Sequence, residues 1–275
     1  MRGETSIQST ARLRREFAPA LRDAGLEAGK VADELFTFGE ALDGSAGLQS
    51  ALTDPSISDK DKLRLVFAIA GDSLSDLTKD ILARIVHCRW SLSRHIASAL
   101  EDLAVDAVLY QADAQGVKGR KIAAQLSQLR SVLLNMPELR SALSDEYSTW
   151  ENRVHLLQTV LKDSGIQPTA MELAMRATRN LRNRRFISTL QWLIERICEH
   201  SGEMVVTVTT ATPLHDEQIE RLAGIYEKKL DRPVHLTMVV DSSVIGGMRI
   251  QYGASVIDNT VAAQLRGLKK KIVLK

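Results

Sequence analysis

The heptapeptide LQSALTD at residues 48–54 recurs as LRSALSD at residues 139–145, an offset of 91 positions. A constant offset of this kind is the signature of an internal duplication. Without gaps, it aligns at least fourteen identical pairs whose first members lie between residues 25 and 83. Beyond residue 83 we expect a short insertion, after which Arg89-Trp90 corresponds to Arg185-Phe186. Outside the heptapeptide the first members include Gly25, Lys30, Ala32, Leu35, Leu42, Asp72, Ser73, Leu82 and Ala83.

Each copy has the pattern of short amphipathic helices. In the first copy Ser58 and Asp61 form an N-terminal capping pair, and apolar residues follow at i, i+3, i+4 and i+7. We expect Ser148 and Glu151 to cap the corresponding helix of the second copy. Helices are also predicted at 81–90 and 187–197, so each copy is expected to be an antiparallel bundle. The two apolar stripes are Leu63, Val66, Phe67 and Ala70, and Val154, Leu157, Val160 and Leu161.

The pattern changes to a mixed one from about residue 203. Runs rich in β-branched residues predict strands at 204–208, 234–240, 248–252 and 256–257, with a helix after Pro213. Gly246 and Gly247 are expected to make a tight reversal between two strands, because glycine adopts positive φ without a steric penalty. Asp258 is expected to cap a final amphipathic helix. Its apolar face would carry Val261, Leu265, Leu268 and Ile272.

These patterns predict a mainly α fold with two tandem antiparallel helical bundles and a small α/β domain that ends in an amphipathic helix. The expected domains are 1–107, 108–202 and 203–275. Aromatic residues make up only 4% of the chain, which suits helices packed through aliphatic side chains better than an all-β sandwich.

Composition excludes several classes of protein. The chain carries 36 basic and 34 acidic residues, for a net charge of +2, so nothing demands a nucleic-acid or membrane partner. No apolar run approaches the ~20 residues of a membrane helix, and the N-terminus does not have the pattern of a signal peptide. Direct membrane insertion is therefore not expected. Cys88 and Cys198 lie in apolar helical patterns and are interpreted as free thiols in a reducing compartment.

No motif predicts catalysis, a cofactor or a metal. The stretch at 25–31 superficially resembles a phosphate loop, but it is one residue short and lacks the Ser/Thr that would hold magnesium. A turn between helices is the better interpretation. His87, Cys88 and His95 are spaced onto different helical faces, so zinc is not expected there. No nucleophile elbow or His-Glu-x-x-His helix is present, and the chain is not expected to be an enzyme.

One local excess of charge stands out, the arginine cluster between Arg176 and Arg185. Such a cluster could bind phosphate backbones. It lacks the interleaved aromatic residues that stack on bases, which favours a solvated face or an acidic protein partner. A nucleic-acid-binding module and a cytosolic helical adaptor remain the alternative functions. The cluster comprises Arg176, Arg179, Arg182, Arg184 and Arg185.

Three segments near the C-terminus together resemble a known family. They are DSSVIGGMRI at 241–250, VID at 256–258 and LRGL at 265–268, and they resemble the C-terminal signature of ATP synthase delta subunits, including the mitochondrial oligomycin-sensitivity-conferring protein. The heptapeptide at 48–54 resembles the family's N-terminal helical bundle. Two features depart from the common pattern: Asn259-Thr260 follows the Ile-Asp pair, and the bundle is duplicated, as in the long actinobacterial variety.

The resemblance implies a non-catalytic stator subunit of the peripheral stalk of a proton-translocating F-type ATP synthase. One copy per complex would lie peripherally at the cytoplasmic face of the cell membrane. Its helical region would hold the α subunits of the α/β catalytic head, and its C-terminal domain the membrane-anchored b subunits. The candidate partner-binding residues are Val261, Leu265, Leu268 and Ile272, for which closure of the local core is the alternative role, and the signature turn is Gly246, Gly247 and Asp258.

Overall fold

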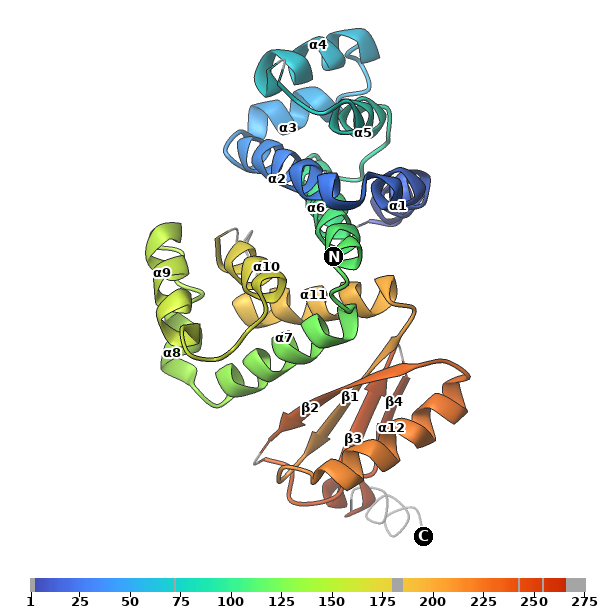
Figure 1. Cartoon of the computed structure of the whole chain (residues 1–275), viewed down its shortest axis with the longest axis vertical. Coiled ribbons are helices and arrows are strands. Elements are labelled where there is room, and N and C mark those ends of the chain that lie inside the picture. The colour runs from blue at the N-terminus through green and yellow to red at the C-terminus, as the bar shows by residue number, and fades with distance from the viewer. Residues whose placement is uncertain (1–2, 72, 180–184, 242, 254, 266–275) are drawn as a thin grey trace, which may run out of the picture. The chain divides into compact units, whose positions relative to one another are not determined.

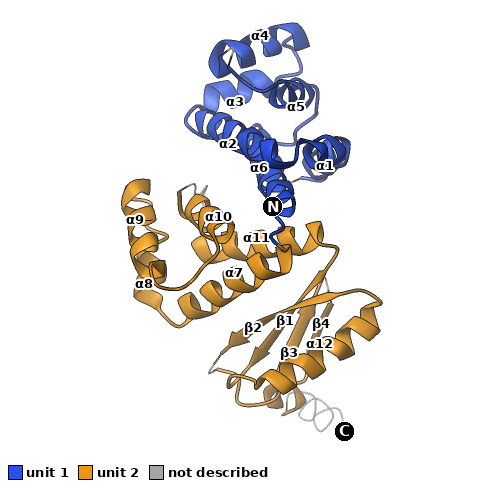
Figure 2. Ribbon diagram, in the orientation of Figure 1, with its two compact units in different colours: residues 1–117 blue, residues 118–275 orange. Residues whose placement is uncertain are grey.

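The structure is a computed structural model that describes residues 3–71, 73–179, 185–241, 243–253 and 255–265. It consists of two compact units, residues 1–117 and 118–275 (Figure 2). The first unit is helical, and the second combines helices with a four-stranded sheet (Figure 1). The predicted fold class, mainly α with a small α/β region near the C-terminus, is confirmed. The division into three domains stays a prediction, and its first boundary, between residues 107 and 108, falls inside helix α6 (His95–Ala114).

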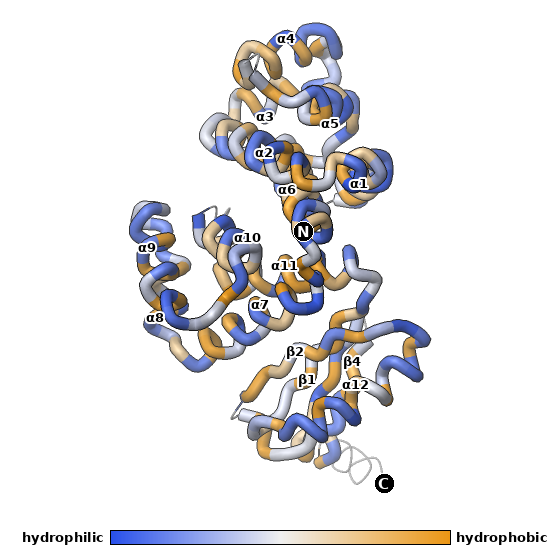
Figure 3. The backbone as a smooth tube through the Cα atoms, in the orientation of Figure 1, coloured by the Kyte–Doolittle hydropathy of each residue, from blue (hydrophilic) through white to orange (hydrophobic). Residues whose placement is uncertain are grey.

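The first unit is organised around α6. Buried residues occur on all sides of this helix, including Leu100, Leu103 and Leu109, and a helix that is apolar all round belongs inside a core. It packs against α1 and α2. The other helices alternate hydrophilic and hydrophobic residues, as amphipathic helices do (Figure 3). The remaining helices are α1 (Glu4–Ala24), η1 (Gly25–Glu27), α2 (Ala28–Asp43), α3 (Ala46–Thr53), α4 (Asp59–Ala70) and α5 (Asp76–Val86).

The helices of the second unit repeat those of the first. Shifting the bounds of α2 and α4 by 91 residues reproduces the bounds of α7 and α9. The starts of α6 and α11 are also 91 residues apart, so the insertion expected after residue 83 was wrong and the register continues. The helices are α7 (Gly119–Leu134), α8 (Pro137–Ala142), α9 (Trp150–Leu161), α10 (Pro168–Arg179) and α11 (Phe186–His200).

The helix caps show one further error of sequence interpretation. Ser58 caps α4 as predicted, because its Oγ accepts from the backbone N–H of Asp61 at 3.2 Å. In the second copy the cap is Thr149, whose side chain accepts from the N–H of Asn152, and not Ser148. The offset of 91 leads from Ser58 to Thr149, so the duplication was the better guide. Similarly, the helix expected to reach Trp90 ends at Val86.

The sheet follows the second bundle, with strand order β2-β1-β3-β4. Strand β1 pairs with β2 in parallel and with β3 in antiparallel, and β3 pairs with β4 in antiparallel. The intervening α12 covers the face that buries Val206, Val208 and Ile250 (Figure 1). Helices α7 and α11 contact β2 and β1. The elements are β1 (Met204–Thr210), α12 (Asp216–Leu230), β2 (Val234–Val240), β3 (Met248–Tyr252) and β4 (Ser255–Asp258).

Candidate interaction surfaces and buried polar sites

The signature turn begins where β2 ends. Asp241 starts it by accepting a hydrogen bond from the N–H of Ser243 at 2.9 Å, and its carbonyl accepts from the N–H of Val244 at 3.0 Å. The hydrogen bonds from Ser243 hold the pKa of the Asp241 carboxyl below its usual value. The acidic residue at the start of the signature therefore fixes the local backbone.

The two glycines serve close backbone packing. Gly247 has φ +79°, and a Cβ there would lie 2.3 Å from the carbonyl oxygen of Asn259. A Cβ at Gly246 would lie 3.3 Å from Val261. The glycine pair lies where the chain reverses between β2 and β3, but these strands do not pair with each other, because they lie on opposite sides of β1. The glycines instead let the turn lie against residues 259–261, with the N–H of Val261 donating to the carbonyl of Gly246 at 3.0 Å.

Asp258 supports the start of the last helix indirectly. Thr260 is the residue whose Oγ1 accepts from the N–H of Ala263, at 3.2 Å. Asp258 Oδ1 in turn accepts from both the N–H and the Oγ1 of Thr260, at 3.1 and 2.6 Å. The expected cap by Asp258 was therefore off by two residues. The polar pair after the Ile-Asp motif, which departs from the family pattern, supplies the cap itself.

Apolar side chains are exposed around this turn. Ile245 is 76% exposed, Val261 39% and Leu265 57%. Val261 lies against Gly246, and Leu265 is one helical turn further along, so we call Ile245, Val261 and Leu265 the signature surface. Leu268 and Ile272, the other candidate partner-binding residues, lie outside the described residues.

The second bundle carries an apolar groove of about 240 Å³. Val132 of α7 and Val160 of α9 are 48% and 43% exposed along it. The first bundle exposes Phe67 and Ile69 on α4, and Ile69 is the residue 91 positions before Val160. We call the following set the bundle groove: Leu129, Val132, Leu133, Leu139, Val160 and Leu161.

Two of the five arginines in the cluster contact other side chains of the chain. Arg176 Nε lies 3.6 Å from Glu172 Oε1, and the guanidinium of Arg179 lies 4.1 Å from the centre of the Trp150 ring. Arg185 precedes α11 as its N-cap residue. Arg182 and Arg184 lie outside the described residues.

The two histidines that were considered as zinc ligands from the sequence, His87 and His95, have other partners. His87 Nδ1 lies 2.5 Å from Asp59 Oδ2, and His95 Nδ1 lies 2.9 Å from Ser6 Oγ. The stretch at 25–31 forms η1 and the start of α2, which agrees with a turn between helices.

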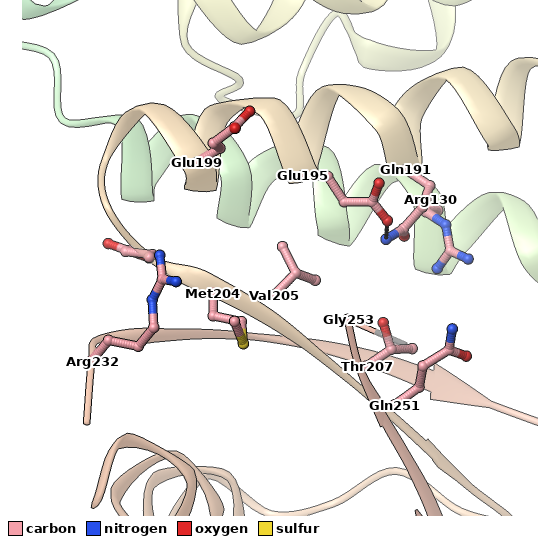
Figure 4. A pocket seen from close by; sticks show the side chains of 11 residues that line it. Arg130, Gln191, Glu195, Glu199, Met204, Val205, Thr207, Arg232, Gln251 and Gly253 are labelled. Carbon is pink, nitrogen blue, oxygen red and sulfur yellow. Dashed lines mark hydrogen bonds between the residues drawn. The ribbon is translucent and has the colours of Figure 1, made fainter. Parts of the chain in front are cut away.

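A polar pocket of about 520 Å³ lies between α11 and the sheet (Figure 4). Val205 and Thr207 of β1 face it from below, and Arg130, Gln191 and Glu195 from the helical side (Figure 4). The Nε and Nη1 atoms of Arg130 are buried and have no hydrogen-bond partner. Burial lowers the pKa of this guanidinium, against the opposing effect of Glu195.

At one end of this pocket lies a cluster of three residues that no sequence pattern groups. Cys198, Glu203 and His235 bring a sulfur, a carboxylate oxygen and a ring nitrogen within 4.8 Å of one another. Burial and the nearby carboxylates raise the pKa of the Cys198 thiol to about 12, while burial and Arg120 lower the pKa of His235 to about 4. These residues come from the end of α11, the residue before β1, and β2, so only the fold brings them together.

Comparison with known proteins identifies the chain's relatives. The profile of the ATP synthase delta (OSCP) subunit matches it twice, over residues 13–108 and 106–272. The chain belongs to the ATP synthase delta (OSCP) family. The ATP synthase subunit delta of Bifidobacterium longum subsp. infantis is 45% identical over 99% of this chain and 98% of its own. Those of Beutenbergia cavernae and Streptomyces coelicolor are 32% and 33% identical, covering 98% and 94% of this chain.

Membership of the delta family confirms the resemblance seen in the C-terminal segments. The relatives include actinobacterial delta subunits and align over both copies of the bundle, so the duplication is shared with the long variety. Within the described ranges, none of the helices combines the length and apolar character needed to cross a bilayer.

Proposed function

We propose that this delta-family chain is a non-catalytic stator subunit in the peripheral stalk of a proton-translocating F-type ATP synthase. It would link the α/β head to the membrane-anchored b subunits and keep the head from turning with the rotor. The observation that carries the proposal is the double match to the delta (OSCP) profile, supported by relatives aligned over 99% of the chain. One copy per complex, held peripherally at the cytoplasmic face of the cell membrane, completes the proposal.

The exposed apolar surfaces suit this role. A connector needs two attachment sites, and helical partners dock by placing an apolar face into an apolar groove. The bundle groove and the exposed residues of α4 are the candidates for holding the α subunits. The signature surface, with Val261 39% and Leu265 57% exposed, is the candidate for the b subunits. These exposed fractions favour partner binding by Val261 and Leu265 over closure of the local core.

A binding measurement with the b subunits tests the signature surface. Val261→Asp and Leu265→Asp place charge on it, and each is expected to weaken binding of a purified b-subunit cytoplasmic fragment by about tenfold or more. Ile225→Asp is the matched control, because Ile225 is an exposed apolar residue of α12, at 49%, outside the signature surface. Unchanged b-subunit affinity in both folded variants would remove this surface from the proposal.

Co-purification separates the stator role from a cytosolic helical adaptor. A tagged chain extracted from membranes in detergent is expected to retain the α and b subunits, and its removal is expected to uncouple proton flow from phosphorylation. An adaptor would retain neither subunit.

Nucleic-acid binding is tested with Arg182→Ala, Arg184→Ala and Arg185→Ala combined. Salt-dependent retention on nucleic acid that disappears in this variant would support the alternative function. Arg176 and Arg179 already contact side chains of the same chain. These contacts favour the stator function over nucleic-acid binding.

A further inference from the structure

Each of the three clustered side chains has a donor atom available for a metal. Ser127 Oγ lies 2.9 Å from His235 Nε2, and a ring nitrogen of His235 lies within 4.8 Å of the Cys198 sulfur and the Glu203 carboxylate. Arg120 Nε lies 3.3 Å from Glu203 Oε1, whereas Glu203 Oε2 is buried and has no hydrogen-bond partner. Cys198 is 1% exposed. A buried carboxylate oxygen without a partner is costly, and a cation would satisfy it.

We propose that Cys198, Glu203 and His235 form a binding site for a divalent zinc ion. A thiolate, an imidazole and a carboxylate are the ligands that Zn²⁺ takes in proteins, and thiolate with imidazole disfavours magnesium and calcium. Around a tetrahedral zinc ion the donor atoms would lie about 3.5 Å apart. The observed separations, all within 4.8 Å, require only small side-chain movements. The site is of the three-ligand kind, with a fourth position for water.

The surroundings of the cluster have the parts that such a site needs. Ser127 would fix the orientation of the His235 ring and Arg120 that of the Glu203 carboxylate, the role of outer-shell partners in zinc sites. Glu203 also lines the pocket of Figure 4, so the proposed site lies next to an open pocket. With thiolate and carboxylate bound, the charge of the ion is neutralised. The thiol proton of Cys198 passes to bulk water as the Zn–S bond forms.

A bound ion would add a further link between parts of the second unit that hydrogen bonds already join, such as the one from the N–H of Glu203 to the carbonyl of Cys198 at 2.7 Å. Cys198 lies in the last turn of α11, Glu203 precedes β1, and His235 lies in β2 next to β1. Zinc would thus stiffen the connection between the helices and the sheet. A chain that transmits torque benefits from rigidity at that connection, although zinc binding can be tested without regard to the stator role.

Metal titration of the full chain tests the site directly. Chelator-treated protein is titrated with Zn²⁺ by calorimetry, and with Co²⁺ while the thiolate-to-cobalt charge-transfer absorption is recorded. We expect one ion per chain, the charge-transfer absorption, and a higher unfolding temperature with Zn²⁺. Cys198→Ser is expected to lose the absorption and to weaken Zn²⁺ binding at least about tenfold.

The second cysteine provides the matched control. Cys88 lies in the first unit and is not part of the cluster, so Cys88→Ser is expected to bind as the unaltered chain does. His235→Gln and Glu203→Gln serve if Cys198→Ser does not fold, and circular dichroism of the metal-free variants verifies folding. Ser127→Ala, which removes the hydrogen-bond partner of His235 Nε2, is expected to weaken binding while keeping the absorption.

Three results would overturn the proposal. They are failure of the unaltered chain to bind Zn²⁺ stoichiometrically, the same affinity in folded Cys198→Ser, and loss of the cobalt absorption in Cys88→Ser. Each of these leaves the proposed stator function untouched, since that function is judged by co-purification and coupling.

Discussion

Gly247 is the residue of the signature turn least able to change. An alanine there meets two costs, the positive φ and a Cβ 2.3 Å from the carbonyl oxygen of Asn259. We expect Gly247→Ala to lower the free energy of unfolding by about 3 kcal/mol. Gly253 has φ +53° and open space around its Cβ position, so Gly253→Ala should cost only about 1 kcal/mol. Urea denaturation of both variants measures the difference, and equal losses would contradict the close-approach argument.

Glu34 of α2 forms hydrogen bonds with residues at the start of α5. Burial raises the pKa of its carboxyl. Hydrogen bonds from Ser75 and Thr78 and the charge of Lys30 lower this pKa by more than burial raises it, so the pKa lies below the ordinary 4.5. A depressed carboxyl pKa contributes stability that is present above the unfolded pKa and lost as pH falls through the folded one. The chain should therefore lose stability as pH falls below about 4.5.

The matched comparison for this pH dependence is Glu34→Gln. The second copy has Gln125 at the corresponding position, and its Oε1 accepts from the N–H of Gln167 at the start of α10, 3.0 Å away, so an amide fits this role. Glu34→Gln should be less stable than the unaltered chain at pH 7, with the gap closing toward pH 3 in urea melts. A gap that does not change with pH would show that the ionised carboxylate is not the stabilising group.

The two copies of the bundle show how far helix prediction from sequence can go. Hydrophobic spacing predicted α4 and α9, because the apolar pattern and the capping residues that define a helix lie within a few positions of each other. The offset of 91 also agrees with the bounds of α7 and α9. The prediction failed where two adjacent residues could both cap, Ser148 and Thr149. The sequence predicted the reversal at Gly246 and Gly247 but not that β1 separates the two strands it joins, because strand pairing is set by contacts distant in sequence. Likewise, no spacing rule could unite Cys198, Glu203 and His235.

The cap of α9 can be checked by paired substitutions. Thr149 Oγ1 accepts from the N–H of Asn152. Ser148 instead accepts a hydrogen bond from Arg153 through its backbone carbonyl, a contact that a Ser148→Ala substitution would leave in place. Thr149→Ala should destabilise the chain by about 1 kcal/mol, and Ser148→Ala by a few tenths at most. Thermal unfolding distinguishes them, and a larger loss in Ser148→Ala would reinstate the original sequence interpretation.

The arrangement of the chain in two units bears on how it could act as a connector. The second family match, 106–272, spans a bundle and the sheet, whereas the first, 13–108, spans helices alone. Residues 118–275 thus contain α-helices together with the described strands, and residues 1–117 add a further bundle. Both bundles remain candidates for the α-subunit site. Fragments of the chain that contain one bundle each could therefore be used to locate that site.

Cutting the chain at two places tests where the first unit ends. Fragment 1–117 contains all of α6 and should unfold cooperatively by itself, because its core is internal to the unit. Fragment 1–107 follows the boundary predicted from sequence and removes Val108, Leu109 and Ala112, each at most 2% exposed. Losing them should cost about 4 kcal/mol, enough to leave a domain of this size barely folded. Equal unfolding midpoints in urea would favour the sequence boundary, whereas a cooperative transition in 1–117 alone would place the boundary after α6.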